Sequence, residues 1–243
     1  MTPDTSRKVA VVTGGAKRLG RHLSLALAGR GYDLVLVYRS SEAAAQAVER
    51  EIAEAGGRGR ALRLDVSDKQ AVAAAFAGIA DAEGRVDLLV NNVGNYSPQD
   101  VTALDPDVWD DTIAANLSGA YYCCYRALAL MPNGGSIINI GMAGLEGIRA
   151  NRRGADYYVS KTGLLVLTRA LAAGYASRRI RVNMVSPGQL DNSVDLPPPE
   201  DIHRWVPLGR SGTLEDIAQA VHYLLDAPYV TGVNLDVAGG YRL

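Results

Sequence analysis

Cysteine and histidine are scarce in this sequence of 243 residues. The two cysteines, Cys123 and Cys124, are neighbours, so a strain-free disulfide between them is implausible and no disulfide framework can form. The three histidines, His22, His203 and His222, are scattered along the chain. We therefore expect neither a Cys-based zinc site nor a metal cluster, and we assign no metal-binding residue.

Long apolar runs and an excess of charge are also missing. No segment reaches the roughly 18 consecutive apolar residues of a membrane helix, and the apolar run 9–12 is too short for a signal peptide. The chain has 25 Lys and Arg against 26 Asp and Glu. This balance gives no electrostatic reason to expect nucleic acid or a membrane as partner. We expect a soluble, cytoplasmic protein in a reducing compartment, with residues 1–6 frayed.

What the sequence does contain is a regular alternation of strand-like and helix-like segments. Short β-branched runs predict strands at 8–13, 33–38, 60–65, 86–91, 136–141, 181–186 and 233–237. Composition and stop signals predict helices at 19–30, 42–55, 69–82, 107–131, 155–176 and 214–225. The alternation predicts an α/β Rossmann fold, a doubly wound seven-stranded parallel sheet flanked by helices, in one domain over 1–243. The only long irregular stretch, 188–212, is interpreted as a substrate loop.

Glycines follow the first predicted strand, in the segment Thr13-Gly14-Gly15-Ala16-Lys17-Arg18-Leu19-Gly20. Glycine permits a tight turn and lets the backbone approach a pyrophosphate, and the following helix start supplies N–H donors. A glycine pair alone is weak evidence, but its place between the first strand and the first helix favours a dinucleotide site. The predicted cofactor-binding residues here are Gly14, Lys17, Arg18, Leu19 and Gly20.

The end of the second predicted strand indicates which dinucleotide binds. Many dinucleotide folds place an acidic residue there for the ribose 2′-hydroxyl. This chain instead reads Tyr38-Arg39-Ser40-Ser41. A carboxylate would repel a 2′-phosphate, whereas Arg39 beside hydroxyls would bind one through charge-assisted hydrogen bonds. We therefore predict NADP(H) as cofactor, bound by Tyr38, Arg39 and Ser40, with Lys17 and Arg18 adding to the same pocket.

A Tyr and a Lys are spaced for catalysis at the start of a predicted helix. The segment Tyr157-Tyr158-Val159-Ser160-Lys161 puts Tyr157 and Lys161 on one helix face. An adjacent ammonium group stabilises a phenolate, which lowers the phenol pKa towards the range that general acid catalysis needs. The motif is weak alone, but its position after the fourth strand of a dinucleotide fold favours a catalytic reading.

Together these segments resemble the short-chain dehydrogenase/reductase family over essentially the whole chain. The matching pieces are the turn 13–20, Asp65-Val66, Asn91-Asn92-Val93-Gly94, Asn116, Tyr157 with Lys161, and the runs 183–188 and 231–240. The resemblance implies that Asp65 and Val66 hold the adenine, and that Asn92, Val93 and Gly94 line the cofactor cleft.

The resemblance also implies a catalytic set. Asn116 would hold a water in a proton relay, and Lys161 would bind the nicotinamide ribose. Pro187 and Gly188 would contact the carboxamide. Tyr157 would deliver a proton while the nicotinamide delivers hydride. The family is commonly tetrameric, so the resemblance implies a homotetramer with a small-molecule substrate.

The first departure from the family pattern is in the glycine turn, where Arg18 stands at the usual middle glycine. The segment 13–21 (TGGAKRLGR), together with Tyr38-Arg39-Ser40, resembles the pteridine reductases within the family. In those proteins an aromatic residue just after the Asn-Asn motif stacks on the pterin, and Tyr96 lies at the matching place. The alternative reading of Tyr96 is an unremarkable loop residue.

The second departure is a missing hydroxyl. The family has a Ser after the fifth strand and pteridine reductases have an Asp, but Met142 takes that position here and has no donor. Three interpretations stay open. In the first, the bond to be reduced needs less polarisation by a hydrogen-bond donor, as the C=N bond of a protonated pterin would. A neighbour such as Tyr158 or Asn151 replaces the donor. Or catalysis is weak, and the chain is an NADP(H)-binding sensor.

The sequence therefore predicts an NADPH-dependent reductase that transfers hydride to a C=O or C=N bond of a small substrate, with a pteridine as first candidate. The alternatives are a 3-oxoacyl or ketone reductase of the same family and the catalytically weak sensor. Besides Tyr96 and Met142, Trp205 in the loop 188–212 is a candidate substrate-binding residue, with simple packing as its alternative role.

Overall fold

The computed structural model describes residues 7–147, 151–193 and 196–242, so the predicted fraying of residues 1–6 concerns residues outside this range. Seven parallel strands form one sheet in the order β3-β2-β1-β4-β5-β6-β7. The strands are β1 Val9–Thr13, β2 Asp33–Tyr38, β3 Gly59–Arg63, β4 Leu88–Asn91, β5 Ser136–Ile140, β6 Arg181–Pro187 and β7 Asn234–Val237. The predicted fold class is confirmed, with strand ends shifted by a residue or two.

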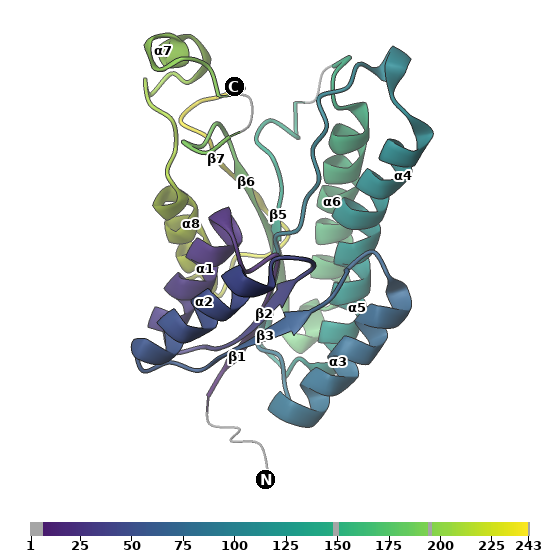
Figure 1. Ribbon diagram of the computed structural model, residues 1–243, viewed down its shortest axis with the longest axis vertical. Helices are drawn as coiled ribbons and strands as arrows, with labels where there is room; N and C mark the ends of the chain where they lie inside the picture. The colour runs from purple at the N-terminus through teal and green to yellow at the C-terminus, as the bar shows by residue number, and fades with distance from the viewer. Residues whose placement is uncertain (1–6, 148–150, 194–195, 243) are drawn as a thin grey trace.

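Helices cover both faces of the sheet, as Figure 1 shows. One face carries α1 Arg18–Gly29, α2 Glu42–Glu54 and α8 Leu214–Asp226, and the other carries α3 Lys69–Glu83, α4 Pro106–Ile113, α5 Gly119–Leu130 and α6 Ala155–Gly174. The strands β1, β4 and β5 are buried along their whole length, because a parallel sheet covered on both faces needs continuous apolar runs. The result is a three-layered α/β sandwich.

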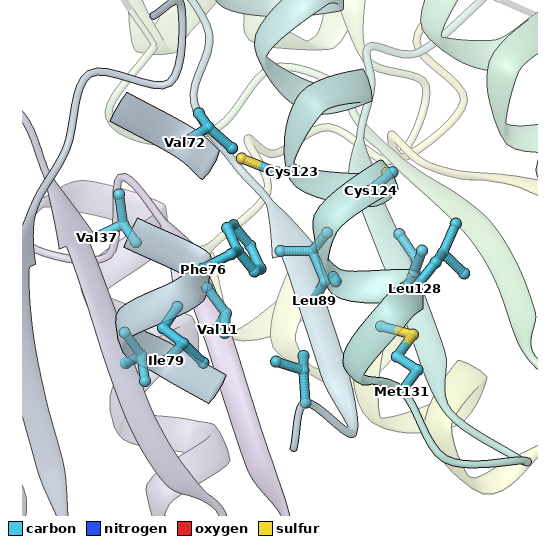
Figure 2. Packing of buried hydrophobic residues seen from close by; sticks show 14 of the residues in the cluster. Val11, Val37, Val72, Phe76, Ile79, Leu89, Cys123, Cys124, Leu128 and Met131 are labelled. Atoms are coloured by element: carbon cyan, nitrogen blue, oxygen red, sulfur yellow. The ribbon is translucent and has the colours of Figure 1, made fainter. Parts of the chain in front are cut away.

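Apolar side chains fill the space between the sheet and its helices. On the α3 and α5 face, Phe76 and Ile79 meet Val11 and Leu89 of the sheet, as Figure 2 shows. Cys123 belongs to the same cluster, and both neighbouring cysteines are buried free thiols. Burial raises the pKa of the Cys124 thiol to about 12, so it stays protonated at neutral pH.

The structure corrects two expectations about continuity. The predicted long helix 107–131 is interrupted by a π-helical segment, Ala114–Ser118, between α4 and α5. The stretch 188–212 is not wholly irregular, because it holds a 3₁₀ turn, Pro199–Asp201, and the short helix α7, Ile202–Trp205. Nor is it the only irregular stretch, since the segments 92–100 and 141–147 also lack helix and strand. Short helices of one turn carry too little periodicity to be recognised in a sequence.

The sheet topology places a binding crevice at the carboxyl ends of the strands. The chain order reverses between β1 and β4, which are neighbours in the sheet although two strands separate them in sequence. Open α/β sheets bind ligands at such a switch point. The segments that follow β1, β4, β5, β6 and β7 therefore meet at one edge. Among the described residues, no helix is long and apolar enough to cross a membrane.

Candidate active site

The turn after β1 is fixed by Asn92, which follows β4. Asn92 Nδ2 donates to the carbonyl oxygens of Thr13 at 3.1 Å and Gly14 at 3.3 Å. The Thr13 hydroxyl oxygen accepts from the N–H groups of Asn92 at 3.0 Å and Val93 at 3.2 Å. These bonds lock the two strand ends together across the switch point. The glycine turn is thus preorganised before any ligand binds.

Two positions in this turn have a backbone that constrains their residue type. A Cβ on Gly20 would lie 2.0 Å from the Gly14 carbonyl oxygen, so only glycine fits there. Arg18 has a φ of 49°, in the left-handed region that glycine prefers. Arg18, which replaces the middle glycine of the family turn, therefore has the backbone conformation that a glycine would adopt there. Its guanidinium donates to the Asn192 carbonyl oxygen, which ties the turn to the loop 188–212.

A pocket of about 240 Å³ lies between the glycine turn and the ends of β2 and β3. It is lined by the residues predicted for the adenosine half of the cofactor, namely Tyr38, Arg39, Ser40, Asp65 and Val66, together with Gly14, Lys17, Val93 and Gly94. Arg39 Nη1 lies 3.8 Å from Asp65 Oδ2, and the Arg39 side chain is 65% exposed. Its guanidinium is thus available at the pocket rim. Arg18 was expected beside Arg39, but it lies in the neighbouring cleft instead.

Asp65 is held as a hydrogen-bond acceptor. Its Oδ1 accepts from the Ser67 N–H at 3.0 Å and the Ser67 hydroxyl at 2.7 Å. Burial acts to raise the pKa of Asp65, but these hydrogen bonds from Ser67 outweigh it and the pKa is lowered. The carboxylate therefore stays ionised at neutral pH beside Arg39.

A larger cleft of about 740 Å³ adjoins this pocket and shares Gly14, Lys17 and Gly94 with it. It is lined by most of the remaining predicted residues, namely Arg18, Leu19, Gly20, Asn92, Tyr96, Met142, Tyr157, Pro187, Gly188 and Trp205. The fold thus gathers residues from 14 to 205 in two adjoining spaces. Together the two spaces offer room for a dinucleotide and a small substrate.

Tyr157 and Lys161 lie one turn apart on α6, and Tyr157 lines the larger cleft. Lys161 Nζ is 5.7 Å from the centre of the Tyr157 ring, and it donates to the Ile140 carbonyl oxygen at 2.7 Å. The side chain is almost fully buried, at 2% exposure. Burial lowers the pKa of Lys161 to about 8. Tyr157 also contacts Tyr96 edge to face, with ring centres 5.1 Å apart.

Asn116 is buried behind the cleft wall, in the π-helical segment Ala114–Ser118. Its Oδ1 accepts from the Asn95 N–H at 2.7 Å, and its Nδ2 donates to the Asn95 carbonyl at 2.9 Å and to Ser160 Oγ at 3.1 Å. A Cβ on Gly94 would lie 3.3 Å from Lys161 Nζ and 3.8 Å from Asn116 Oδ1. Gly94 therefore permits the close approach of these two groups. π-Helical turns of this kind often occur at functional sites.

Met142 lines the cleft together with Tyr157 and Tyr158. The Tyr158 hydroxyl oxygen accepts from Asn151 Nδ2 at 2.8 Å. The Asn151 Oδ1 in turn accepts from the Arg153 N–H at 3.0 Å, which fixes the orientation of the amide. Both neighbours proposed as replacements for the missing hydroxyl are thus in one hydrogen-bonded chain beside Met142.

Trp205 stacks on Tyr241, with ring centres 6.5 Å apart and an angle of 13° between the rings. Its side chain both packs and lines the cleft, at 50% exposure. Sequence reasoning did not single out Tyr241 or Arg242, although both line the cleft. The signal was available, because they follow β7 and the carboxyl ends of parallel strands share one edge. Within the described residues, no group of three or more His, Cys, Asp or Glu side chains could hold a metal ion.

Comparison with known proteins agrees with this geometry. The family model described as "Enoyl-(Acyl carrier protein) reductase" matches residues 14–242. The chain is 37% identical to the 3-oxoacyl-[acyl-carrier-protein] reductase of Bos taurus, with 97% of this chain and 98% of that protein covered. It is also 37% identical to the 3beta-hydroxysteroid dehydrogenase 1 of Eggerthella lenta, with coverage of 100% and 97%.

Solved structures show the same fold. A short-chain dehydrogenase/reductase from Serratia marcescens superposes with a TM-score of 0.91 at 32% identity, covering 97% of this chain and 98% of that one. A blue fluorescent protein from a metagenomic library, solved in complex with NADPH, superposes with a TM-score of 0.90 at 34% identity and the same coverage. With fold, site and relatives in agreement, the chain belongs to the short-chain dehydrogenase/reductase family of oxidoreductases.

Proposed function

We propose that this protein is an NADPH-dependent reductase that transfers hydride to the carbonyl carbon of a small substrate. The observation that carries the proposal is that Tyr157 lines an open cleft beside the glycine turn, with the buried Lys161 against its ring and Asn116 close to Lys161. Tyr157 is the one of these groups on the cleft wall, where it can meet a substrate oxygen.

The residues present fit NADP(H). Glycine at positions 14 and 20 lets the turn pack tightly, since a Cβ would lie 3.0 Å from Asn92 Nδ2 at Gly14 and 2.0 Å from the Gly14 carbonyl oxygen at Gly20. A tight glycine turn at a helix start suits a pyrophosphate. Lys17 lines both spaces, and the Arg39 guanidinium lies at the rim of the smaller pocket with Ser40 beside it. These donors suit a 2′-phosphate. When bound, the cofactor supplies the hydride, and the NADPH complex of the metagenomic blue fluorescent protein supports this choice.

The chain's own residues then handle the proton. Tyr157 donates its phenolic proton to the substrate oxygen as negative charge develops there. The Lys161 ammonium stabilises the resulting phenolate, because a buried cation acts strongly at short range. Asn116, held by Asn95 and Ser160, positions a water that returns a proton to Lys161 and Tyr157.

A second donor to the substrate oxygen is Tyr158, which takes the role left open at Met142. The Tyr158 oxygen already accepts from Asn151, so its own O–H is left to donate elsewhere. Tyr158 lines the same cleft as Tyr157 and Met142. A donor aimed at a developing oxyanion is worth on the order of 10²–10³ in rate. This assignment favours the replacement-donor interpretation over a catalytically weak sensor.

A carbonyl is the preferred substrate group. The 3-oxoacyl reductase and the hydroxysteroid dehydrogenase among the relatives bear names that refer to carbonyl or alcohol carbons. A pterin C=N bond is the second candidate, favoured by Tyr96, which lines the cleft and packs against Tyr157. A pteridine substrate stays a prediction.

The experiment is NADPH oxidation against a panel of ketones, diketones, 3-oxoacyl thioesters and pterins, run in parallel with NADH. Turnover of carbonyl compounds with NADPH supports the proposal. Turnover of pterins alone favours the second candidate. If no panel compound is reduced although NADPH binds tightly, the result would instead support the NADP(H)-binding sensor.

We also propose a homotetramer in the cytoplasm. Exposed apolar side chains lie on α5, at Tyr121 and Tyr125, and on α6, at Val159 and Val166. Such a surface on neighbouring helices suits contact between copies of the chain. Sedimentation equilibrium of the native protein tests the state directly, and a monomer would contradict it.

A further inference from the structure

We infer that the substrate carries an anionic oxygen group, a carboxylate or a phosphate, which Arg242 and Arg153 bind within the larger cleft. This inference rests on the proposed function, because it names the chemical class of that reaction's substrate. It concerns two residues that have no part in the proposed cofactor site or the proton transfer.

The charged residues described along the larger cleft are all cations. Its described lining includes the cations Lys17, Arg18, Arg153 and Arg242, and none of these lining residues is an Asp or a Glu. Lys17 and Arg18 belong to the turn after β1, where a cofactor's phosphates account for positive charge. Arg153 and Arg242 come from the segments before α6 and after β7. The cofactor accounts for neither of them.

Arg242 is held in place by aromatic rings rather than by a carboxylate. Its Cζ lies 4.9 Å from the centre of the Tyr241 ring and 5.2 Å from that of Tyr158. A Cβ on Gly144 would come within 2.9 Å of the Arg242 Cβ, so the side chain sits directly against the segment that follows Met142. Arg242 also hydrogen-bonds to the hydroxyls of Tyr241 and Tyr158. A guanidinium has five N–H donors, and those that these tyrosines do not use can bind an oxyanion.

Arg153 lines the same cleft. Its backbone N–H donates to Asn151 Oδ1, and Asn151 Nδ2 donates to the Tyr158 hydroxyl, whose ring lies beside Arg242. In the described part of the chain, neither Arg153 nor Arg242 has an ion pair. The adjacent Arg152, by contrast, pairs with Asp100 at 3.0 Å. Two cations without a carboxylate partner therefore line the cleft that contains Tyr158, the tyrosine that we place at the reacting carbonyl.

The rest of the cleft wall indicates the body of such a substrate. Tyr96 lies against Tyr157, and Trp205 stacks on Tyr241, so the walls near the reacting end are aromatic. Aromatic walls suit a flat or apolar scaffold. The substrate class is thus a carbonyl compound with an aromatic or apolar body and an anionic group on it.

The test uses matched probes and matched variants. Binding of benzoate, phenylphosphonate and neutral benzamide to the NADP⁺-saturated protein is measured by calorimetry. Reduction of 4-acetylbenzoate is compared with that of its methyl ester. The variants are Arg242→Met and Arg153→Met, and the control is Arg152→Met, which removes a neighbouring arginine that is paired with Asp100.

We expect the native complex to bind an anion more tightly than benzamide, and Arg242→Met to weaken that binding by about tenfold or more. Arg242→Met should raise the KM for 4-acetylbenzoate by a similar factor and leave the KM for the methyl ester nearly unchanged. Arg152→Met should change anion binding and the KM for 4-acetylbenzoate little. Whether benzoate or phenylphosphonate binds better distinguishes a carboxylate from a phosphate. Equal binding of anions and benzamide, or unchanged anion binding in both variants, would overturn the inference.

The two proposals fail in different ways. Anion binding that depends on Arg242, without NADPH oxidation by any panel compound, would contradict the proposed reductase and leave the anion site standing. Reduction of acid and ester with equal efficiency, unaffected by Arg242→Met, would contradict the anion site and leave the reductase standing.

Discussion

Replacing Lys161 with Met should stabilise the protein at neutral pH while it abolishes reduction. Lys161 is 2% exposed, and burial lowers its pKa from 10.5 to about 8. The folded protein therefore carries a poorly solvated cation at pH 7. At 1.36 kcal/mol per pKa unit, the cost of keeping this group charged is about 3 kcal/mol. The fold tolerates such a cost where the charge serves catalysis.

The net gain is smaller, because the substitution also removes a hydrogen bond. Lys161 Nζ donates to the Ile140 carbonyl at 2.7 Å, and losing that partner costs about 1–2 kcal/mol. Lys161→Met should therefore raise the free energy of unfolding at pH 7 by about 1–2 kcal/mol. Methionine has a similar length and fills the same apolar space.

The sign of the pH dependence follows from the lowered pKa. Between pH 8 and 10.5 the unfolded chain binds more protons at Lys161 than the folded chain does, so native stability rises with pH through this window. The advantage of Lys161→Met should thus be largest below about pH 8, shrink as the pH rises, and become a deficit of about 1–2 kcal/mol, from the lost hydrogen bond, by about pH 10.5. Since other groups titrate equally in both proteins, the difference between them isolates this one.

Urea unfolding of both cofactor-free proteins, at equal concentration and at pH 7 and pH 10, measures the effect. Lys69→Met removes an exposed lysine at the start of α3 and is the matched control, with a change below about 0.5 kcal/mol. If Lys161→Met is destabilised by the same amount at both pH values, the ammonium carries no burial cost and the reasoning fails.

Further predictions concern the smaller pocket, the glycine turn and the donors to the substrate oxygen. Arg39→Ala should weaken NADPH binding about tenfold or more, since a charge-assisted contact is worth roughly 1.5–3 kcal/mol, and leave NADH nearly unchanged; equal native affinities for the two cofactors would refute this. Gly20→Ala should abolish measurable NADPH binding, because its Cβ would lie 2.0 Å from the Gly14 carbonyl oxygen. If fluorescence titration shows that the variant still binds NADPH, the turn can change shape at little cost. Tyr158→Phe should lower ketone turnover by about 10²-fold with NADPH binding retained. Because Tyr158 already supplies the donor, Met142→Ser should leave native ketone reduction nearly unchanged and restore part of the loss in the Tyr158→Phe background. Unchanged turnover in Tyr158→Phe would place the second donor elsewhere.

The fold class could be predicted because local signals and global topology agree. The runs at β1, β2 and β4 are short, β-branched and bounded by turn residues, so composition alone indicates buried parallel strands. The turn 13–20 and the spacing of Tyr157 and Lys161 are likewise local patterns. Each of these patterns identifies its own structural element from residues that are close in sequence, without knowledge of distant contacts.

The features that the sequence left open depend on distant contacts. The π-helical segment around Asn116 has no local signature, and Asn116 makes its hydrogen bonds to Asn95 and Ser160, which come from other parts of the chain. The direction of Arg18 depends on the Asn192 carbonyl, 174 residues away in the chain. Arg242 reaches Tyr158 only because β7 ends at the same sheet edge. Such positions need the fold before their role can be predicted.

The central claim is that Tyr157 protonates the substrate oxygen, and the substitution Tyr157→Phe tests it most directly. The change keeps the ring, and with it the contact to Tyr96, and removes only the hydroxyl. NADPH oxidation with a carbonyl substrate that the native protein reduces should fall by roughly 10²–10⁴, with NADPH affinity nearly unchanged. A variant that keeps more than about a tenth of native turnover, with the larger loss in Tyr158→Phe instead, would contradict the account and give the acid's role to Tyr158.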